Sequence, residues 1–491
     1  MHDDSISKLV SEVSSLHASK TPFRINHGSS NSVRVKEPGT PTLNIAHLNH
    51  ILSISPEHNI TVVEPNVSLD VLLSETLKQG LMPPVVMEFP GITVGGGFSS
   101  VSGESTCWKE GSFDNCIDEI EIILGDGTLV QAVKGGKNAD LFDAARCSMG
   151  TLGVVTLLKV RLVDAKPFVE VTYHRTSSIK ELIGETVAFC NDRSDGLDFV
   201  EGIAFSKTHG TVIVGRMVEK RDAHLPLQRF DCASSPWFYR HARAIASVKH
   251  TEVVPLYSYL FRYDRGAFWT GESFFNYWGI SNNRFWRTLC NPFLNARASY
   301  RSMHAVGGPG TGIVQDLIIP AQNAETFISW VEKDVGIWPL WVCPVRRKDE
   351  VWGSAFWKGI KEKKFDYEVD GSLTLNIGIW GAGPDSYSDF LKVNRQMEHV
   401  LRQVHGMKIS YAQSFYTEDE LWELYDKDEY QKARKKWNAQ WLPSVWDKIN
   451  RRAVETEGDD NDTGYAGGLF MKILMTWPIG GIYTSWKSLG W

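Results

Sequence analysis

Residues 91–105 read GITVGGGFSSVSGES, and this stretch decides how the fold is interpreted. It places five glycines and four serines in fifteen positions, directly after the apolar run VVMEFP (85–90). Strand-like sequence returns about a dozen residues later. A surface turn is the usual explanation of such a stretch. A ligand-binding loop is the alternative, and the surrounding sequence has to distinguish the two.

A second small-residue turn, HGSSNS (27–32), follows the short strand predicted at 23–26. Backbone N–H groups can converge on phosphate oxygens where side chains are absent and φ is unrestricted. Two such turns in one α+β unit therefore favour a diphosphate-containing cofactor held from two sides. A Rossmann fingerprint is not found, because GGPGTG (307–312) has the wrong spacing and precedes a strand. We interpret that segment as a connecting loop.

Composition bounds the class of protein. The chain has 491 residues, 42% of them hydrophobic, which is enough for two or three domains. Its net charge of −6 gives no basis for nucleic-acid binding. The seven cysteines show no CxxC pair and no spacing typical of a metal site, so we expect reduced thiols and no metal.

The termini and the aromatic residues give further expectations. We find neither a secretory signal nor an ordinary transmembrane span. The segment 469–486 comes closest to a span, but Lys472 and Pro478 interrupt it. It is expected either to contact a membrane surface or to pack on its own protein. Seventeen of the 18 tryptophans lie beyond residue 165, which indicates different roles for the two parts of the chain.

Periodicity predicts an α+β fold. Apolar residues at helical spacing predict helices over 5–17, 68–80, 136–150 and 389–406. Alternating patterns predict strands over 118–133 with an Asp-Gly turn, and over 151–165, 210–219 and 312–320.

At this point the sequence resembles a known group. TVGGGFSSVSGES (93–105) is similar to the second diphosphate loop of the FAD-linked oxidase superfamily typified by vanillyl-alcohol oxidase, whose FAD-binding domain is of the PCMH type. HGSSNS stands at the first loop, and GTLGVVTLLKVRL (150–162) at the later glycine turn and strand. The chain is most similar to the Δ24-sterol reductases, the 24-dehydrocholesterol reductase and Diminuto group. The segments that indicate this are 108–130, 140–153, 198–205, 259–269, 314–320, 338–344 and 410–426.

The resemblance implies a domain organisation and a set of FAD contacts. It implies a two-part PCMH-type FAD-binding domain over 1–165, an α+β substrate or cap domain over 166–405, and a segment over 406–491 that returns to the FAD domain and ends in a tail. The implied FAD-binding residues are His27, Gly28, Ser29, Ser30, Asn31, Ser32, Thr93, Val94, Gly95, Gly96, Gly97, Ser99, Ser100, Gly103, Glu104, Ser105, Gly150, Thr151, Gly153 and Val154. Each single glycine could also be a structural turn.

Some relatives attach the flavin covalently through a histidine of the first loop. Asn31 stands at that position here, so the resemblance implies a noncovalent FAD. Two departures weaken the inference to a sterol at the endoplasmic reticulum. The chain begins directly with the FAD domain, without the N-terminal membrane segment of animal and plant members, and about 60 residues extend beyond the family's usual end.

Reduction of an isolated alkene needs a hydride from the flavin and a proton from an acid in a dry pocket. The candidate groups are Glu201, Tyr411 and Arg262, with Asp264 and Arg265 beside Arg262. For each of them an ordinary salt bridge or core hydroxyl is the alternative. The later aromatic residues suit an apolar polycyclic or isoprenoid substrate, although they are also common in cores.

The leading hypothesis is an FAD-dependent reductase of a carbon–carbon double bond in a sterol-like or terpenoid substrate, with NADPH as reductant. One alternative is an FAD-dependent oxidase or dehydrogenase of a hydrophobic natural-product intermediate. The other is a redox-neutral protein of the same fold that isomerises or binds a lipid. The expected location is the cytoplasm, with peripheral contact to the endoplasmic reticulum membrane through the C-terminal tail. The sequence leaves the oligomeric state open.

Overall fold

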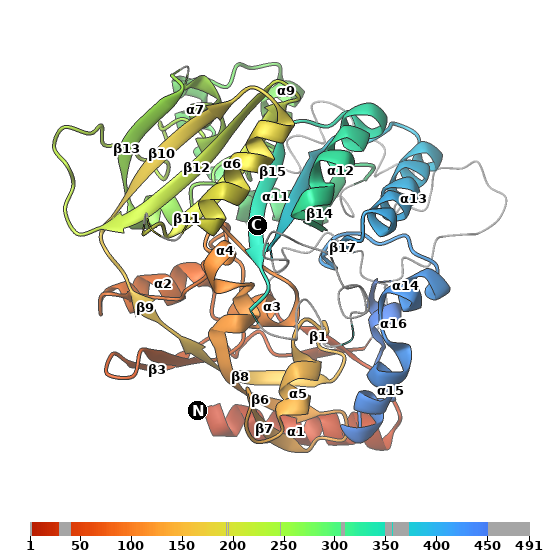
Figure 1. Cartoon of the computed structure of the whole chain (residues 1–491). Coiled ribbons are helices and arrows are strands. Elements are labelled where there is room, and N and C mark those ends of the chain that lie inside the picture. The colour runs from red at the N-terminus through yellow and green to blue at the C-terminus, as the bar shows by residue number, and fades with distance from the viewer. Residues whose placement is uncertain are drawn as a thin grey trace.

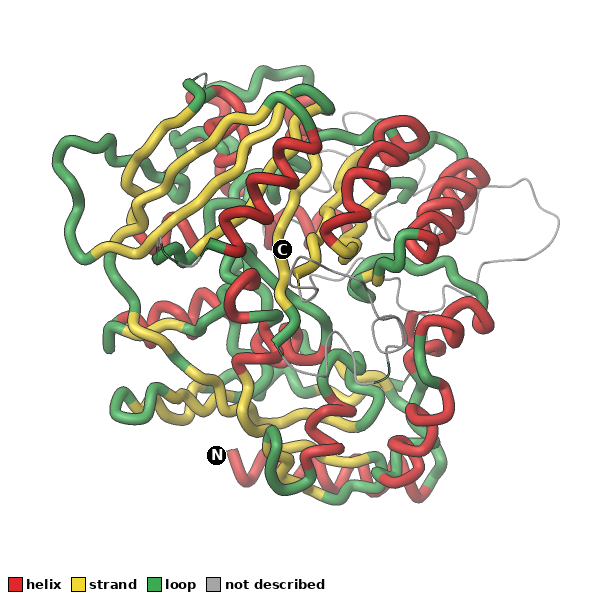
Figure 2. Tube along the Cα trace, in the orientation of Figure 1, coloured by secondary structure: helices red, strands yellow, loops and turns green. Residues whose placement is uncertain are grey.

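The computed structural model describes most of the chain as a mixed α+β structure. The described residues are 2–28, 41–192, 194, 196–245, 247–305, 310–348, 356 and 373–449. Figures 1 and 2 show two groups of strands, one at each end of the molecule, with helices beside both. The predicted α+β class is confirmed. No helix in this part of the chain is long and apolar enough to cross a bilayer.

The first sheet, as far as the chain is described, has five antiparallel strands in the order β3-β4-β8-β6-β7. These strands are β3 (Ile51–Ser55), β4 (Ile60–Val63), β6 (Ile117–Leu124), β7 (Leu129–Val133) and β8 (Gly153–Arg161). β6 and β7 form the hairpin predicted around Asp126-Gly127. Gly127 has a φ of +90°, which glycine adopts without strain. The turn therefore sets the register in which β6 and β7 pair.

Short elements surround the first sheet. The helices are α1 (His2–Ala18), α2 (Leu69–Leu77), α3 (Val94–Ser99), α4 (Cys107–Glu110) and α5 (Ala139–Ala145). The strand β1 (Arg24–Asn26) pairs with β2 (Thr42–Asn44), and β5 (Leu81–Met82) pairs with β9 (Val163–Asp164). The helix predicted over 68–80 is confirmed as α2, which buries Leu69, Leu72 and Leu73 at helical spacing.

The second sheet has eight described strands in the order β13-β10-β12-β11-β15-β16-β14-β17, all antiparallel. They are β10 (Phe168–Thr176), β11 (Phe199–Ser206), β12 (His209–Val218), β13 (Lys249–Pro255), β14 (Ile313–Pro320), β15 (Leu340–Arg346), β16 (Leu373–Gly381) and β17 (Met407–Lys408). The helices α6 (Ile179–Asn191), α12 (Ala324–Trp330) and α13 (Tyr387–Gln403) cover its outer face (Figure 1).

The inner face of the second sheet belongs to the same core as the first sheet. Side chains alternate along each strand, so Val342 packs under the outer helices while Trp341 and Cys343 join the inner core. By the same alternation Glu201 of β11 and Asp316 of β14 are on the inner side, opposite Val200 and Leu317 in the outer cluster. The two sheets therefore enclose one interior that contains both apolar and ionisable groups.

The remaining helices complete the second half and return to the first. They are α7 (Phe238–Ala244), α8 (Leu256–Leu260), α9 (Glu272–Trp278), α10 (Arg284–Leu289), α11 (Ala296–Ala305), α14 (Glu418–Leu424), α15 (Lys427–Lys436) and α16 (Val445–Ile449). At the return, the Lys436 ammonium lies 2.7 Å from the Asp140 carboxylate and Asn438 Nδ2 donates to Asp126 at 2.8 Å. The C-terminal helices thus rest on the first sheet and α5 (Figure 1).

Candidate functional site

The glycine stretch 91–105 folds into a short helix followed by an irregular segment. Thr93 is the N-cap of α3, and its hydroxyl accepts a hydrogen bond from the Gly96 amide at 3.2 Å. The buried side chains of Val94 and Phe98 fix the helix on the core. Because glycine is a poor helix former, this element could not be predicted from propensity.

The three consecutive glycines have different environments. A β-carbon on Gly95 would lie 2.6 Å from Pro65 Cβ, and one on Gly97 would lie 2.6 Å from Met87 and Phe113. These two glycines are required by close packing. Gly96 is exposed, and a β-carbon there would meet only the Thr93 hydroxyl, at 3.0 Å. Gly96 therefore presents bare main chain to solvent, although the amides of residues 94–97 already donate hydrogen bonds within the protein.

The third predicted segment is bonded directly to the second. The amide of Met149 donates to the Ser99 carbonyl at 2.8 Å, and the amide of Cys147 donates to the Phe98 carbonyl at 3.0 Å. Gly150 follows with a φ of +68°. Its predicted companions Thr151, Gly153 and Val154 continue into β8, where a β-carbon on Gly153 would collide with the Ile123 carbonyl at 2.5 Å.

The first predicted segment approaches the same place. A β-carbon on Gly150 would lie 3.0 Å from Ile25 Cδ1, two residues before His27. Both His27 and Gly28 are exposed, and Gly28 has a φ of +71°. Ser29, Ser30, Asn31 and Ser32 lie outside the described residues. The structure thus brings the end of β1, the end of α3 and the Gly150 turn together, as a shared ligand requires.

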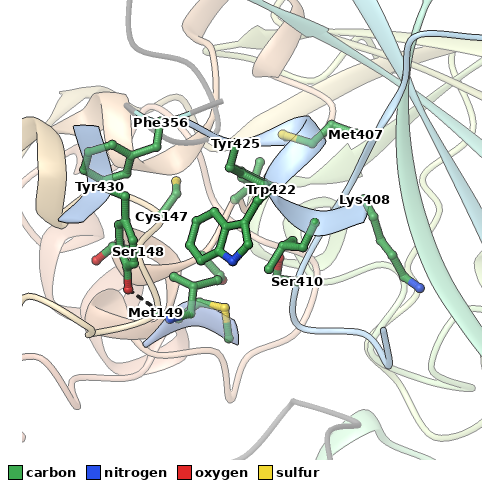
Figure 3. Close-up of a pocket in the computed structure, with 14 residues that line it drawn as sticks. Cys147, Ser148, Met149, Phe356, Met407, Lys408, Ser410, Trp422, Tyr425 and Tyr430 are labelled. Carbon is green, nitrogen blue, oxygen red and sulfur yellow. Dashed lines mark hydrogen bonds between the residues drawn. The ribbon is translucent and has the colours of Figure 1, made fainter. Parts of the chain in front are cut away.

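A pocket opens where the second and third segments meet the C-terminal part of the chain (Figure 3). The empty space within it, including the part that is open to solvent, is about 550 Å³. Ser100, Ser148 and Met149 line it from the first part, and Trp422 and Tyr425 from the C-terminal part.

The C-terminal helices close one side of this region. The Lys448 ammonium donates to the carbonyl oxygens of Met149 and Gly150 at 2.9 and 3.1 Å. Lys408, on β17, contributes to the pocket wall, but its ammonium points away (Figure 3) and donates to the Glu398 carboxylate at 2.7 Å. Lys448 therefore holds the C-terminal segment against the Gly150 turn.

Two of the predicted catalytic groups belong to a buried ion cluster. The Arg262 guanidinium contacts the carboxylates of Glu201 and Glu104 at 2.7 and 2.5 Å, and the side chains of all three are at most 1% exposed. Glu201 also accepts hydrogen bonds from Tyr263 and Trp341 at 2.8 and 2.7 Å. Such saturation is typical of a structural ion pair, and the catalytic role of Glu201 and Arg262 stays a prediction.

The same cluster connects the two halves of the chain. Ser105 donates to Glu104 through its hydroxyl, and its carbonyl accepts from the Val200 amide at 2.8 Å. Burial raises the pKa of Glu104 to about 7, against the opposing charge of Arg262. A β-carbon on Gly103 would lie 2.9 Å from Cys107 Sγ. Gly103, Glu104 and Ser105, predicted to contact FAD, are thus packed toward the second sheet.

Tyr411 belongs to a second polar cluster that sequence reasoning only partly found. Its hydroxyl donates to Asp316 Oδ2 at 2.5 Å, and Asn376 Nδ2 donates to Asp316 Oδ1 at 2.7 Å. Trp380 Nε1 lies 3.3 Å from the Tyr411 hydroxyl. Burial raises the pKa of Asp316 to about 6, although these donors oppose the shift.

Glu88, in the apolar run before the glycine stretch, lies near this cluster. Burial first, and then the charges of Asp316 and Glu104, raise the pKa of Glu88 to about 8. Glu88 and Asp316 also raise the pKa of Tyr300, which burial already shifts upward. A carboxyl with a pKa of about 8 is protonated at neutral pH. Neither Glu88 nor Asp316 was predicted as a site residue from the sequence, although a carboxyl in a largely apolar segment could have indicated both.

Aromatic rings surround the second cluster. Trp380 packs against Phe268 with ring centroids 4.0 Å apart and against Trp341 at 6.0 Å. Phe89, next to Glu88, contacts Phe268 at 5.6 Å and Tyr300 at 6.2 Å. Asp316 is therefore buried among apolar surfaces, and Glu88 and Tyr411 are partly buried beside them.

Comparison with known proteins identifies the first part of the chain. Residues 4–132 match the family model described as FAD binding domain. This segment is an FAD binding domain. It contains the end of β1 and α3 with its exposed Gly96, whereas the Gly150 turn lies beyond the matched residues.

The chain is also similar to curated proteins over most of its length. It is 26% identical over 480 residues to a Delta(24)-sterol reductase of Arabidopsis thaliana, covering 89% of this chain and 82% of the relative. The Homo sapiens Delta(24)-sterol reductase is 26% identical over 423 residues, covering 83% of this chain and 77% of that protein. A Decaprenylphosphoryl-beta-D-ribose oxidase of Mycolicibacterium smegmatis is 26% identical over 157 residues, covering 32% of this chain and 34% of that protein.

These comparisons confirm the predicted resemblance to the Δ24-sterol reductases and the prediction of an FAD-dependent oxidoreductase. The residues present fit the cofactor. The exposed backbone at Gly96 and the meeting point of three glycine segments allow a long ligand to approach the main chain closely. The individual FAD contacts and the domain boundaries at 165 and 405 stay predictions.

Proposed function

We propose that the chain reduces a carbon–carbon double bond in a sterol-like or terpenoid substrate, with NADPH as electron donor. The similarity to proteins named Delta(24)-sterol reductase over more than four fifths of this chain supports the proposal. The observation that carries it is the acid cluster of Glu88, Asp316 and Tyr411 among aromatic side chains. Alkene reduction needs a proton source in such a dry environment.

Under this proposal FAD lies along the three glycine segments. The exposed backbone at Gly96 would let the diphosphate lie close to the main chain of α3, and the Gly150 turn with the pocket beside Ser148 would lie next to the rest of the dinucleotide. The bound flavin supplies hydride transfer between NADPH and the substrate. The first 165 residues would form the FAD domain, residues 166–405 the substrate domain, and the segment from 406 the return to the FAD domain.

The chain's own residues would provide the proton and the apolar surface. Glu88 is the acid that is protonated at neutral pH, because burial raises its pKa to about 8. Tyr411 is the weaker acid, since burial and the neighbouring Asp316 charge raise its pKa further above the ordinary value. We therefore assign proton delivery to Glu88. We assign the orientation of the substrate carbon to the pair of Asp316 and Tyr411. The rings of Trp341 and Trp380 would exclude water.

An anaerobic stopped-flow experiment tests the reaction. We expect purified yellow protein to lose its flavin absorbance with NADPH and to regain it when a sterol with a Δ24 double bond is added. The same sterol with a saturated side chain is the control and should not restore the absorbance. Loss of flavin colour with a sterol alone would instead support an oxidase or dehydrogenase. A spectrum that no electron donor changes would support the redox-neutral alternative.

Two further points belong to this proposal. We propose a noncovalent FAD, which acid precipitation would release into the supernatant; retention of the colour in the pellet would contradict it. We also propose a cytoplasmic protein with peripheral contact to the endoplasmic reticulum membrane. The tail expected to make that contact, 466–491, lies outside the described residues.

A further inference from the structure

The helix α10 has its polarity reversed. Phe285 and Leu289 are 67% and 60% exposed, whereas Arg287 is only 9% exposed. The Arg287 guanidinium is turned inward and donates to the Ser235 carbonyl at 3.1 Å and to Asn282 Oδ1 at 3.0 Å. A surface helix ordinarily shows its charged residues to water and buries its apolar ones. The outward face of α10 is therefore suited to an environment less polar than water.

The neighbouring helix α9 adds aromatic side chains. Tyr277 is 39% exposed, and its ring contacts Trp278 at 5.2 Å. Phe274 of α9 stacks on Phe293, just after α10, with ring planes 14° apart, so the two helices are joined by packing. Figure 1 places α9 at the edge of the molecule far from α1 and the FAD domain. We call Tyr277, Trp278, Phe285, Trp286 and Leu289 the α9–α10 surface.

In the segment 272–293 together with Arg240, three arginines stand against one carboxylate. Arg284 is exposed at the start of α10, and Arg240, 42% exposed, donates to the Asn282 carbonyl at 2.8 Å between the two helices. The one carboxylate of the segment 272–293, Glu272, is engaged by Arg240 at 2.9 Å and by Tyr239. Aromatic side chains with a cationic rim are typical of proteins that lie on an anionic bilayer.

The exposed area argues for lipid rather than for a second copy of the chain. The partly exposed apolar side chains of this surface together present an accessible area on the order of 400 Å². A stable protein–protein interface buries about 800 Å² from each partner. A bilayer has no such requirement, because a few apolar side chains inserted at the headgroup level, with basic residues beside them, are enough for reversible binding.

From the reversed polarity of α10, the aromatic side chains of α9 and the arginine rim, we infer that the α9–α10 surface docks the protein on an anionic lipid bilayer, with Phe285 and Leu289 inserted. The surface lies outside the FAD domain and uses none of the groups assigned to catalysis. The inference stands independently of the proposed reaction, because lipid binding needs no flavin chemistry.

Vesicle flotation of the full chain tests this inference. We expect the protein to float with vesicles of phosphatidylcholine and phosphatidylserine, and the double variant Phe285→Ser with Leu289→Ser to lose about tenfold or more of that binding. The matched control is Leu52→Ser with Leu129→Ser, whose parent side chains are 41% and 43% exposed on the first sheet. It should float like the unmodified protein. Both doubles should keep the flavin spectrum and the thermal transition.

Charge provides a second arm. Arg284→Glu should weaken binding to vesicles that contain phosphatidylserine and leave binding to pure phosphatidylcholine unchanged. Unchanged flotation of the Phe285 and Leu289 double variant would overturn the inference. A result in which flotation is lost only when residues 466–491 are removed would overturn it as well. Light scattering that shows a dimer of the unmodified protein, dissociated by the same double substitution, would assign the surface to a second copy instead.

Discussion

The clearest structural prediction concerns Arg262, which holds two buried carboxylates. Its Nε and Nη2 atoms donate to Glu201 at 2.9 and 2.7 Å, its Nη2 atom also contacts Glu104 at 2.5 Å, and its side chain is fully buried. In Arg262→Met a chain of similar length remains, but both carboxylates lose their counter-ion. Removal of one partner from a buried ion pair costs about 3–5 kcal/mol of unfolding free energy.

The assay is urea unfolding followed by tryptophan fluorescence at pH 7 and at pH 5. We expect Arg262→Met to lose about 3–5 kcal/mol at pH 7, and less at pH 5. The difference arises because burial already raises the pKa of Glu104 to about 7, and protonation at low pH removes its uncompensated charge. The triple variant Arg262→Met, Glu104→Gln and Glu201→Gln should recover most of the loss, because it leaves no unpaired charge in the interior.

A matched control comes from the second sheet, to which Glu201 also belongs. Arg216 pairs with Glu170 at 2.8 Å, but its side chain is 52% exposed. Arg216→Met should therefore change the unfolding free energy by less than about 1 kcal/mol. If Arg262→Met behaves like Arg216→Met at pH 7, or if the triple variant is less stable than the single one, the cluster does not hold the two sheets as argued.

Three further predictions concern the flavin and the acid cluster. Gly96→Ala should weaken FAD binding with an almost unchanged fold, whereas Gly97→Ala, whose β-carbon would lie 2.6 Å from Met87, should cost about 1–3 kcal/mol of unfolding free energy. Titration with FAD measures the first effect and urea unfolding measures the second. Equal loss of stability in the two variants would contradict the different roles assigned to Gly96 and Gly97. Glu88→Gln should abolish flavin reoxidation by a Δ24 sterol while NADPH still bleaches the protein. Tyr411→Phe should slow the same step to a smaller extent. An unchanged reoxidation rate in Glu88→Gln would rule out Glu88 as the proton donor. The contribution of Glu88 to the unfolding free energy should be present below pH 4.5 and lost as pH rises through about 8, since the folded protein keeps a proton that the unfolded chain releases. Glu88→Gln should therefore reduce the fall of the unfolding free energy with pH in this range. An unchanged fall would disprove the raised pKa of Glu88.

Much of the local structure could be predicted from sequence periodicity. The hairpin around Asp126-Gly127 and the helix that begins after Ser68 have strong local signals, namely a turn dipeptide and regularly spaced leucines. The helix α3 could not be predicted, because the Thr93 cap and the burial of Phe98 override the low helix propensity of three glycines. The glycine pattern predicted where a cofactor would bind, and those contacts stay a prediction.

The site could be predicted only where residues are close in sequence. Tyr411 was a candidate, but its partner Asp316 is 95 positions away and is brought to it by the pairing of β14 with β17. The ion cluster depends in the same way on the second sheet, in which β11 lies beside β15 although well over a hundred residues separate them. Such neighbours follow from strand order, which no local pattern determines.

The Arg262 cluster also limits how the molecule can move. It lies where the carbonyl of Ser105 meets the amide of Val200, between the FAD domain and the second sheet. Hinging the two sheets apart would separate Glu104 from Arg262, although Glu201 would keep its partners in the second half. Under the proposed function, exchange of substrate and product would then rely on smaller displacements of loops and side chains.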